Sequence, residues 1–272
     1  MIYRNSEKMK RVSLTKTNYA VLIDFDKTMT TMDSDDSWTV IQNPNFLNPD
    51  LSIRSNKLAK KYCPIEMDYH MPKEEKFSHM VDWYTQVLDL YYEYGLTEDT
   101  LISCVKSGNL TLRSGLTDFL FSLYQAHVPV VILSAGIGNV IREVLALHDC
   151  LYDNIYIMSN FFTFEKNRLL PFSNPIIHTC NKTLSALPTT VIQKLNQKEY
   201  FLLFGDFIED IHMVPKEDLR KTLSFGFLEK KVTENLRQYQ NSFDIVLTDN
   251  TSFYEVQDML DSLTEDEDSK NI

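Results

Sequence analysis

Cysteine is scarce in this sequence, and its spacing argues against two kinds of site. The four cysteines are scattered, and no two of them form a CxxC pair. Zinc sites and the disulfide frameworks of secreted proteins need clustered cysteines, so neither is indicated. Buried free thiols are the expected state, because cysteine is among the most frequently buried residue types. The cysteines are Cys63, Cys104, Cys150 and Cys180.

Long apolar runs and an excess of basic residues are also lacking. Residues 1–20 mix Lys and Arg with polar residues and never form the apolar core of a signal peptide, and no later run is long enough to span a membrane. The formal net charge of -11 argues against binding to polymeric nucleic acid or to an anionic membrane surface. We therefore expect a cytoplasmic protein, and a monomer, that holds any phosphate by local groups.

What the sequence does contain is a series of short, continuous apolar runs. Such runs, without polar alternation, are typical of strands buried on both faces of a mainly parallel sheet. Two stretches with helical spacing, Leu116–Gln125 and Ile137–Leu147, each adjoin one of the runs. The pattern predicts a doubly wound α/β fold, and 272 residues suffice for a full core. The runs are Tyr19–Ile23, Val128–Leu133, Ile155–Met158, Tyr200–Phe204 and Phe243–Leu247.

One region breaks this alternation of strand and helix. Residues 43–108 contain no comparable apolar run, and Lys73–Tyr94 has the spacing of a helix with one apolar face. The simplest interpretation is a helical cap at 43–108, inserted after the first strand into a core formed by 1–42 and 109–264. Residues 265–272 are an acidic tail, which we expect to be disordered.

Two acids follow the first apolar run, in the motif DFDKT. In open α/β sheets, ligands bind outside the carboxyl ends of the strands, so residues at these ends are the candidates for a site. Alternation along the chain places Asp24 and Asp26 on the same side. One carboxylate can attack phosphorus, and the other can protonate the leaving oxygen and later take a proton from water. For this motif alone, a solvated turn is the alternative.

Three further motifs carry polar groups after later strands. LSAGIG, at Leu133–Gly138, places Ser134 and backbone N–H groups in a small-residue turn where they can bind phosphoryl oxygens; a packing loop is the alternative. Lys182 offers a cation for a phosphoryl group, although a lone Lys is usually a surface residue. In GDFIED, Asp206 is the candidate Mg²⁺ ligand, and Asp210 would support Lys182 or a metal-bound water. Either acid could instead cap a helix.

Taken in order, DFDKT, LSAGIG, HTCNKT and GDFIED resemble the four motifs of the haloacid dehalogenase (HAD) superfamily of phosphatases. Further stretches, among them Glu74–Lys76, Met80–Thr85, Ser159–Phe161 and Ser242–Leu247, resemble the cytosolic 5'-nucleotidase III family, also called pyrimidine 5'-nucleotidases. This resemblance covers Tyr19–Leu263. It implies a Rossmann-like core with a helical cap. It also implies Mg²⁺-dependent hydrolysis of nucleoside 5'-monophosphates, a pyrimidine such as CMP or 7-methyl-GMP, through an aspartyl-phosphate intermediate.

The resemblance also implies roles for the residues that match the motifs. Asp24 would be the nucleophile and Asp26 the proton donor. Mg²⁺ would be held by Asp24, by the backbone carbonyl of Asp26 and by Asp206. The substrate phosphate would be contacted by Ser134, Ala135 and Lys182.

Two residues are matched to the recognition of the base. Glu66 corresponds to a family glutamate that contacts the base, and its carboxylate can accept hydrogen bonds from an exocyclic amine. Trp38 falls where the family carries a stacking His or Tyr. Its indole would suit a positively charged ring such as 7-methylguanine, with a core tryptophan as the alternative. We place Trp83 in the core of the cap.

The sequence departs from the family pattern at positions that affect substrate choice. Met29–Met32 replaces a Ser-Arg-Phe stretch, and Val87 stands where the family has a serine near the base. GDSxGD is replaced by GDFIED, so Phe207 and Glu209 stand beside the expected metal. Two alternatives therefore stay open. The chain could be a phosphatase of the same fold for another small phosphomonoester, or a catalytically impaired protein that binds a nucleotide or a partner.

Overall fold

The sheet at the centre of the molecule is mainly parallel and doubly wound. The computed structural model describes residues 1–4, 9, 12–15, 17–68, 70–184 and 187–263, so the predicted acidic tail lies outside the described residues. Within them a seven-stranded sheet has the order β1-β9-β8-β7-β2-β3-β4, and each neighbouring pair is parallel except β1 and β9. The predicted fold class is therefore confirmed. The strands of this sheet are β1 (Ile2–Arg4), β2 (Tyr19–Ile23), β3 (Val130–Ile137), β4 (Ile155–Asn160), β7 (Tyr200–Gly205), β8 (Thr222–Phe227) and β9 (Ile245–Leu247).

The strands form where the chain is apolar on both sides, because both faces of the sheet are covered. In β2, Val21 and Ile23 pack into one core cluster, whereas Ala20 and Leu22 pack into the cluster on the opposite face. Continuous apolar runs meet this requirement. Strand β8 has no such run, since Ser and Gly interrupt its apolar residues, yet all of it is buried. The sequence of β8 therefore contains no continuous apolar run that would predict a strand.

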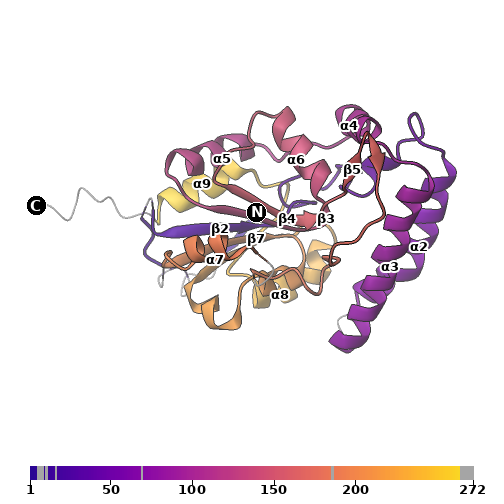
Figure 1. The fold of residues 1–272 in the computed structure, drawn as a ribbon. Helices are drawn as coiled ribbons and strands as arrows, with labels where there is room; N and C mark the ends of the chain where they lie inside the picture. The colour runs from indigo at the N-terminus through magenta and orange to yellow at the C-terminus, as the bar shows by residue number, and fades with distance from the viewer. Residues whose placement is uncertain (5–8, 10–11, 16, 69, 185–186, 264–272) are drawn as a thin grey trace, which may run out of the picture.

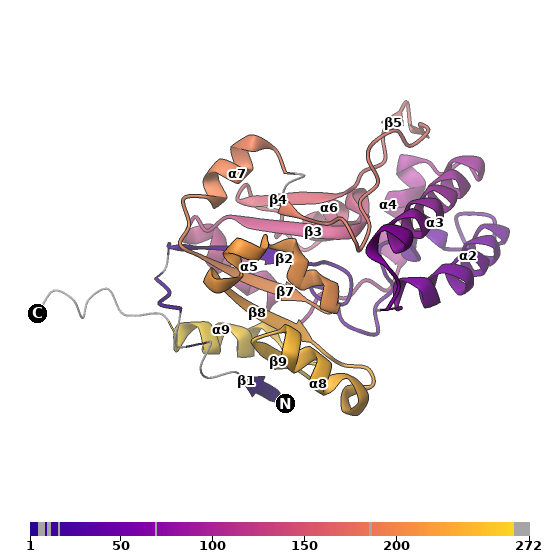
Figure 2. The ribbon, with the colours of Figure 1, turned by 90° about the horizontal axis from the view of Figure 1, so that it is seen from below.

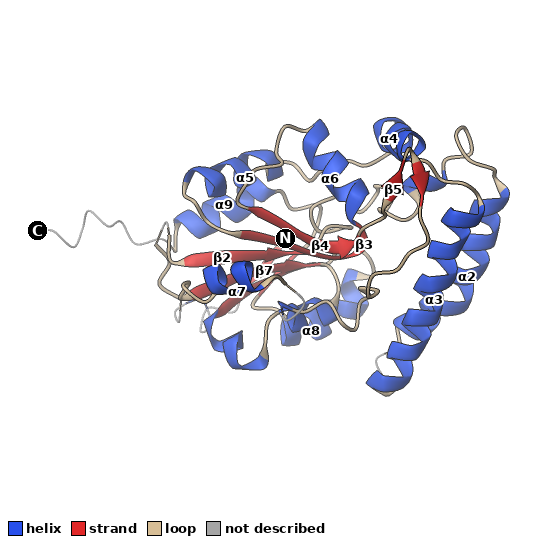
Figure 3. Cartoon of the chain, in the orientation of Figure 1, coloured by secondary structure: helices blue, strands red, loops and turns tan. Residues whose placement is uncertain are grey.

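Helices cover both faces of the sheet (Figures 1 and 3). Helices α5, α6 and α9 pack on one face, and α7 and α8 pack on the other. No helix in the described part of the chain has the length and apolar content that crossing a membrane requires. The bounds are α5 (Leu116–Gln125), α6 (Gly138–Leu147), α7 (Thr189–Leu195), α8 (Val232–Ser242) and α9 (Phe253–Asp261), with 3-10 helices η1 (Val40–Gln42), η3 (Ile208–Met213) and η4 (Lys216–Lys221).

Two long helices stand side by side beyond one end of the sheet (Figures 1 and 2). They are α2 (Asp50–Glu66) and α3 (Lys73–Glu93), and a buried cluster of Tyr62, Met80 and Tyr84 lies between them. The next helix, α4 (Glu98–Ser107), packs instead against α6 and η1. A short antiparallel hairpin of β5 (Phe164–Glu165) and β6 (Arg168–Leu169) lies near α4.

Candidate active site

Segments that follow neighbouring strands bring three acids and a lysine together. Asp24 follows β2 and Asp206 follows β7, and these two strands pair directly. One carboxylate oxygen each of Asp24, Asp206 and Asp210 lies within 4.8 Å of the others. The Nζ atom of Lys182 lies 2.6 Å from Oδ1 of Asp24 and 2.7 Å from Oδ1 of Asp210. Four residues selected from the sequence therefore form one cluster.

Burial makes the negative charges of this cluster costly. It is the largest cause that raises the pKa of Asp24 to about 6, and Lys182 opposes the rise. Burial, followed by the charges of Asp24 and Asp210, raises the pKa of Asp206 well above its ordinary value. Acids crowded in this way are stabilised as carboxylates by a bound cation. Since Mg²⁺ prefers such hard oxygen ligands, the donors here fit that ion.

Asp26 lies outside this cluster and has different partners. Its Oδ2 accepts a hydrogen bond from Ser37 Oγ at 2.6 Å, and its Oδ1 accepts one from the Ser37 backbone N–H at 2.8 Å. Burial, and then the charge of Asp36, raise the pKa of Asp26 to about 7. A carboxyl group with this pKa is substantially protonated near neutral pH, so it can act as a general acid.

Strand β3 extends further than the sequence predicted. The expected small-residue turn at residues 134–136 is wrong, because the strand continues to Ile137 with a register shift after Leu133. Such an irregularity re-aims side chains without ending the strand. Ser134 is buried, and its Oγ accepts a hydrogen bond from the backbone N–H of Gly136 at 3.0 Å.

Gly136 fits against the Ser37 and Asp26 pair. A Cβ atom at this position would lie 1.9 Å from Ser37 Oγ and 2.8 Å from Asp26 Oδ2. Ser37 Oγ also accepts a hydrogen bond from the backbone N–H of Ile137 at 3.1 Å. The absence of a side chain at Gly136 therefore lets β3 approach the carboxyl group of Asp26.

A cavity of roughly 360 Å³ lies between these strand ends and helices α2 and α3. The two helices thus stand over the carboxyl ends of the strands. Of the predicted site residues, all but the supporting Asp210 line this cavity: Asp24, Asp26, Trp38, Glu66, Ser134, Ala135, Lys182 and Asp206.

Glu66 is the last residue of α2 and lies half-buried in this cavity. Its Oε1 accepts a hydrogen bond from Thr179 Oγ1 at 3.0 Å. Burial is the main cause that raises the pKa of this carboxyl group. Thr179 belongs to the loop that carries Lys182, so the helix end and the lysine loop are joined beside the cavity.

Aromatic side chains form the other wall of the cavity. Trp38 packs edge to face on Tyr84, with ring centroids 5.1 Å apart, and it also lines the cavity. Both interpretations of Trp38 therefore describe part of its surroundings. Trp83 stacks on Tyr62 at 5.8 Å, but it is half-buried and lines the cavity as well. Trp83 thus packs against the buried cluster between α2 and α3, as predicted, and it also borders the cavity.

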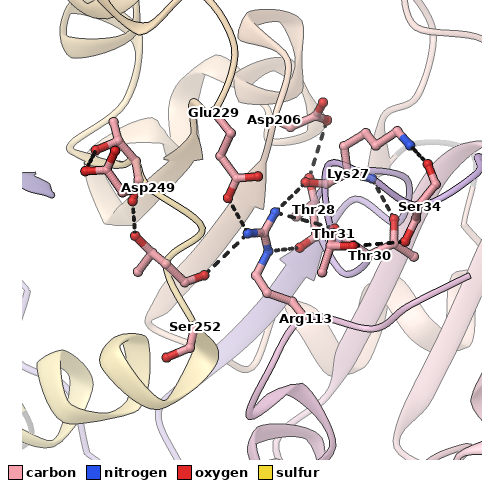
Figure 4. A network of polar contacts seen from close by, with 12 residues as sticks. Lys27, Thr28, Thr30, Thr31, Ser34, Arg113, Asp206, Glu229, Asp249 and Ser252 are labelled. Carbon is pink, nitrogen blue, oxygen red and sulfur yellow. Dashed lines mark hydrogen bonds and ion pairs between the residues drawn. The ribbon is translucent and has the colours of Figure 1, made fainter.

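Arg113 is a residue that the sequence did not single out. It is only 2% exposed, and its Nη1 pairs with Oε1 of Glu229 at 2.5 Å. Figure 4 shows the guanidinium directed at the loop after β2: Nε donates to the carbonyl of Thr28 at 3.0 Å, and Nη2 donates to that of Lys27 at 2.8 Å. A lone Arg outside any motif gave no signal in the sequence.

The loop that Arg113 binds has an unusual backbone and connects to the acids. Lys27 has φ 67°, a left-handed conformation that residues other than glycine seldom adopt. Thr28 Oγ1 lies 3.4 Å from Oδ1 of Asp206, toward which it donates a long hydrogen bond (Figure 4). Arg113 thus holds a strained turn directly after Asp24 and Asp26.

The family model, a curated relative and a solved structure that match this chain are all 5'-nucleotidases. The family model described as Pyrimidine 5'-nucleotidase (UMPH-1) matches residues 26–264. The 7-methylguanosine phosphate-specific 5'-nucleotidase A of Xenopus laevis is 33% identical over 235 residues, which cover 84% of this chain and 81% of the relative. The crystal structure of cytosolic 5'-nucleotidase IIIB bound to cytidine matches with a TM-score of 0.83 at 27% identity, covering 96% of this chain and 93% of that one.

A more distant structure shares the fold alone. A HAD family hydrolase from Salmonella enterica has a TM-score of 0.62 at 18% identity, covering 92% of this chain and 72% of that one. The expected HAD-like core is therefore confirmed.

Proposed function

Because the chain belongs to the pyrimidine 5'-nucleotidase (UMPH-1) family of phosphomonoester hydrolases, we propose that it hydrolyses nucleoside 5'-monophosphates with the acids and lysine of this site. The observation that carries the proposal is the position of Lys182 between Asp24 and Asp210, at the base of a cavity with aromatic walls. Phosphate and base can then occupy opposite ends of one cavity. Residues 43–108 would act as the cap, and a monomeric, cytoplasmic protein remains a prediction of the sequence.

Asp24 and Asp26 divide the chemistry between them in this proposal. Asp24 attacks phosphorus and forms an aspartyl-phosphate, while the bond from phosphorus to the nucleoside oxygen breaks. Asp26, held by Ser37, gives its proton to that leaving oxygen. Asp26 then takes a proton from the water that cleaves the aspartyl-phosphate, which releases phosphate and restores both carboxyl groups.

Lys182 and Asp210 provide the electrostatic support. Burial opposes the charge on Lys182, but Asp210 and Asp24 together raise the pKa of its ammonium group above the ordinary value. Lys182 therefore stays positive and can stabilise the charge of the transferring phosphoryl group. Ser134 and the backbone at Ala135 would bind its other oxygens.

Mg²⁺ is the cofactor that these donors fit. Asp24, Asp206 and the backbone carbonyl of Asp26 would hold it, and Asp210 would remain with Lys182. When bound, Mg²⁺ neutralises negative charge on the phosphoryl group during transfer.

The aromatic wall and Glu66 favour a base that is cationic and carries an amine. Indole faces attract positively charged rings, and such contacts contribute roughly 0.5–2 kcal/mol. A carboxylate accepts hydrogen bonds from the exocyclic amine of guanine or cytosine, whereas uracil has none to offer. We propose 7-methyl-GMP as the better substrate and CMP as the second. The name of the Xenopus laevis relative supports this order.

Phosphate release from a panel of monophosphates tests the proposal. The panel contains 7-methyl-GMP, CMP, UMP and sugar phosphates, with and without Mg²⁺, beside an Asp24→Asn variant. We expect Mg²⁺-dependent release from the first two, abolished by the substitution. Equal rates on sugar phosphates would favour a phosphatase for another small phosphomonoester. No release from a folded protein would favour an impaired binding protein.

A further inference from the structure

An ion pair joins the cap helices to the acid-bearing loop, and the reaction as described makes no use of it. Lys76 lies in α3, and Glu209 lies in η3, directly before Asp210. The Nζ atom of Lys76 is 3.8 Å from Oε1 of Glu209. The two side chains are only 7% and 19% exposed, so water screens this attraction little. The charges therefore connect α3 to the loop that carries Asp206 and Asp210.

Lys76 also contacts the end of α2, where Glu66 lies. Its Nζ donates a hydrogen bond to the backbone carbonyl of Glu66 at 3.0 Å. The carboxylate of Glu66 is itself held by Thr179, from the Lys182 loop. One ammonium group thus links the end of α2 to η3, while the Glu66 side chain is fixed to a second core segment. Two contacts, one to its backbone and one to its side chain, therefore hold Glu66 beside the core.

Hydrogen bonds compensate the burial of the Glu209 carboxylate only in part. Among the residues that the structure describes, its Oε2 is buried without a hydrogen-bond partner. A buried carboxylate without such partners is costly unless a cation lies nearby. Glu209 is also one of the two residues by which GDFIED departs from the family pattern noted above. In this structure Glu209 is the residue of the core that pairs with Lys76 of the cap helix α3.

We propose that Lys76 and Glu209 form a positioning pair that sets the cap over the phosphate site and so favours substrates with a base. This inference rests on the proposed nucleotidase function. A nucleotide touches both sides of the link, since its base lies near Glu66 and its phosphate lies near Lys182. A small aryl phosphate needs only the phosphate side, so its hydrolysis should not depend on the pair.

The test compares two substrates in three variants. Glu209→Gln keeps the shape of the side chain and removes its charge, Lys76→Met removes the cation, and the third variant combines both. We expect kcat/KM for 7-methyl-GMP to fall about tenfold in Glu209→Gln, mainly through a higher KM. The value for p-nitrophenyl phosphate should stay within about twofold of the wild type. In the Lys76→Met background, Glu209→Gln should add little, because the two residues act as a unit.

Two exposed residues provide matched controls. Lys73→Met on the same helix and Glu217→Gln on η4 remove the same kinds of charge away from the cavity and should leave both substrates unchanged. An equal fall for both substrates in Glu209→Gln would overturn the inference, since it would show general damage to the acid loop. Additive effects in the double variant would also overturn it. A wild type that cleaves the aryl phosphate but no nucleotide would instead refute the proposed function, and the pair with it.

Discussion

Replacing Arg113 by methionine tests how the loop after β2 is held. The substitution keeps an unbranched apolar stem but removes the guanidinium group, and with it the charge and the hydrogen-bond donors. It leaves the carboxylate of Glu229, whose side chain is only 8% exposed, without the cation 2.5 Å away. The carbonyls of Lys27 and Thr28 also lose their donors, at 2.8 and 3.0 Å.

The expected loss of stability is large. Removing one partner of a buried ion pair costs about 3–5 kcal/mol, mostly because the other charge stays buried. This is a substantial part of the roughly 5–15 kcal/mol by which folded domains are stable. The double variant Arg113→Met with Glu229→Leu lacks both charges of this pair. Much of the lost free energy of unfolding should therefore return. We expect a reduced kcat in Arg113→Met, because the loop of Lys27 and Thr28 loses its hydrogen bonds. The double variant should keep this reduced kcat, since it does not restore those bonds.

Urea denaturation and phosphate release measure the two effects separately. Arg113→Lys is the control that keeps the charge, but it cannot reproduce the fork of donors, so we expect better stability than in Arg113→Met and a reduced kcat. The reasoning would be refuted if Arg113→Met lost less than about 1 kcal/mol. It would also be refuted if the stabilised double variant regained full kcat, because Arg113 would then have no positioning role.

Three further predictions concern other groups. Gly136→Ala should lower the free energy of unfolding by roughly 1–3 kcal/mol and kcat by about 100-fold, because the new Cβ would displace Ser37 and Asp26. A kcat near that of the wild type would contradict this. If protonated Asp26 is the acid, kcat/KM should fall as pH rises through about 7, and Ser37→Ala, which removes a donor that lowers this pKa, should move the fall to higher pH; an unchanged profile would count against Asp26. Burial lowers the pKa of His178 to about 4 from an ordinary 6.5, so the unfolded chain binds the proton more readily. The stability that neutral His178 contributes should therefore be full above pH 6.5 and decrease as pH falls toward 4. The difference in free energy of unfolding between the wild type and His178→Gln should shrink over this range, and a difference that does not change with pH would contradict this.

The convergence at the strand ends follows from sequence because it depends on topology. Acids after two buried strands must meet if those strands pair, as β2 and β7 do. Strand β8 was missed since polar and glycine residues can be buried in a central strand when its neighbours supply the apolar surface. The end of β3 was misjudged because small residues at 134–136 suit a turn and an irregular strand equally.

The support around the site was less predictable than the acids. Arg113 binds backbone carbonyls, and these carry no residue-specific signal that a sequence could reveal. Ser37 lies 11 residues from Asp26, and only the folded loop brings them together. The Lys76 and Glu209 contact depends on how α3 meets η3, which no local pattern encodes. Motifs thus indicate the reacting groups, while their orientation comes from tertiary packing.

The central claim is that Asp24 forms a covalent intermediate with the substrate phosphate, and trapping that intermediate tests it most directly. Protein is mixed with Mg²⁺ and 7-methyl-GMP labelled in its phosphate, quenched in acid, and analysed for label on the peptide that contains Asp24. In an Asp26→Asn variant the label should appear more slowly, because the leaving oxygen lacks its acid, and should also be lost more slowly, because the water that cleaves the intermediate lacks its base. We predict an alkali-labile phosphate on Asp24 that is absent in Asp24→Asn. Phosphate release without any labelled protein, and undiminished in Asp24→Asn, would contradict the account.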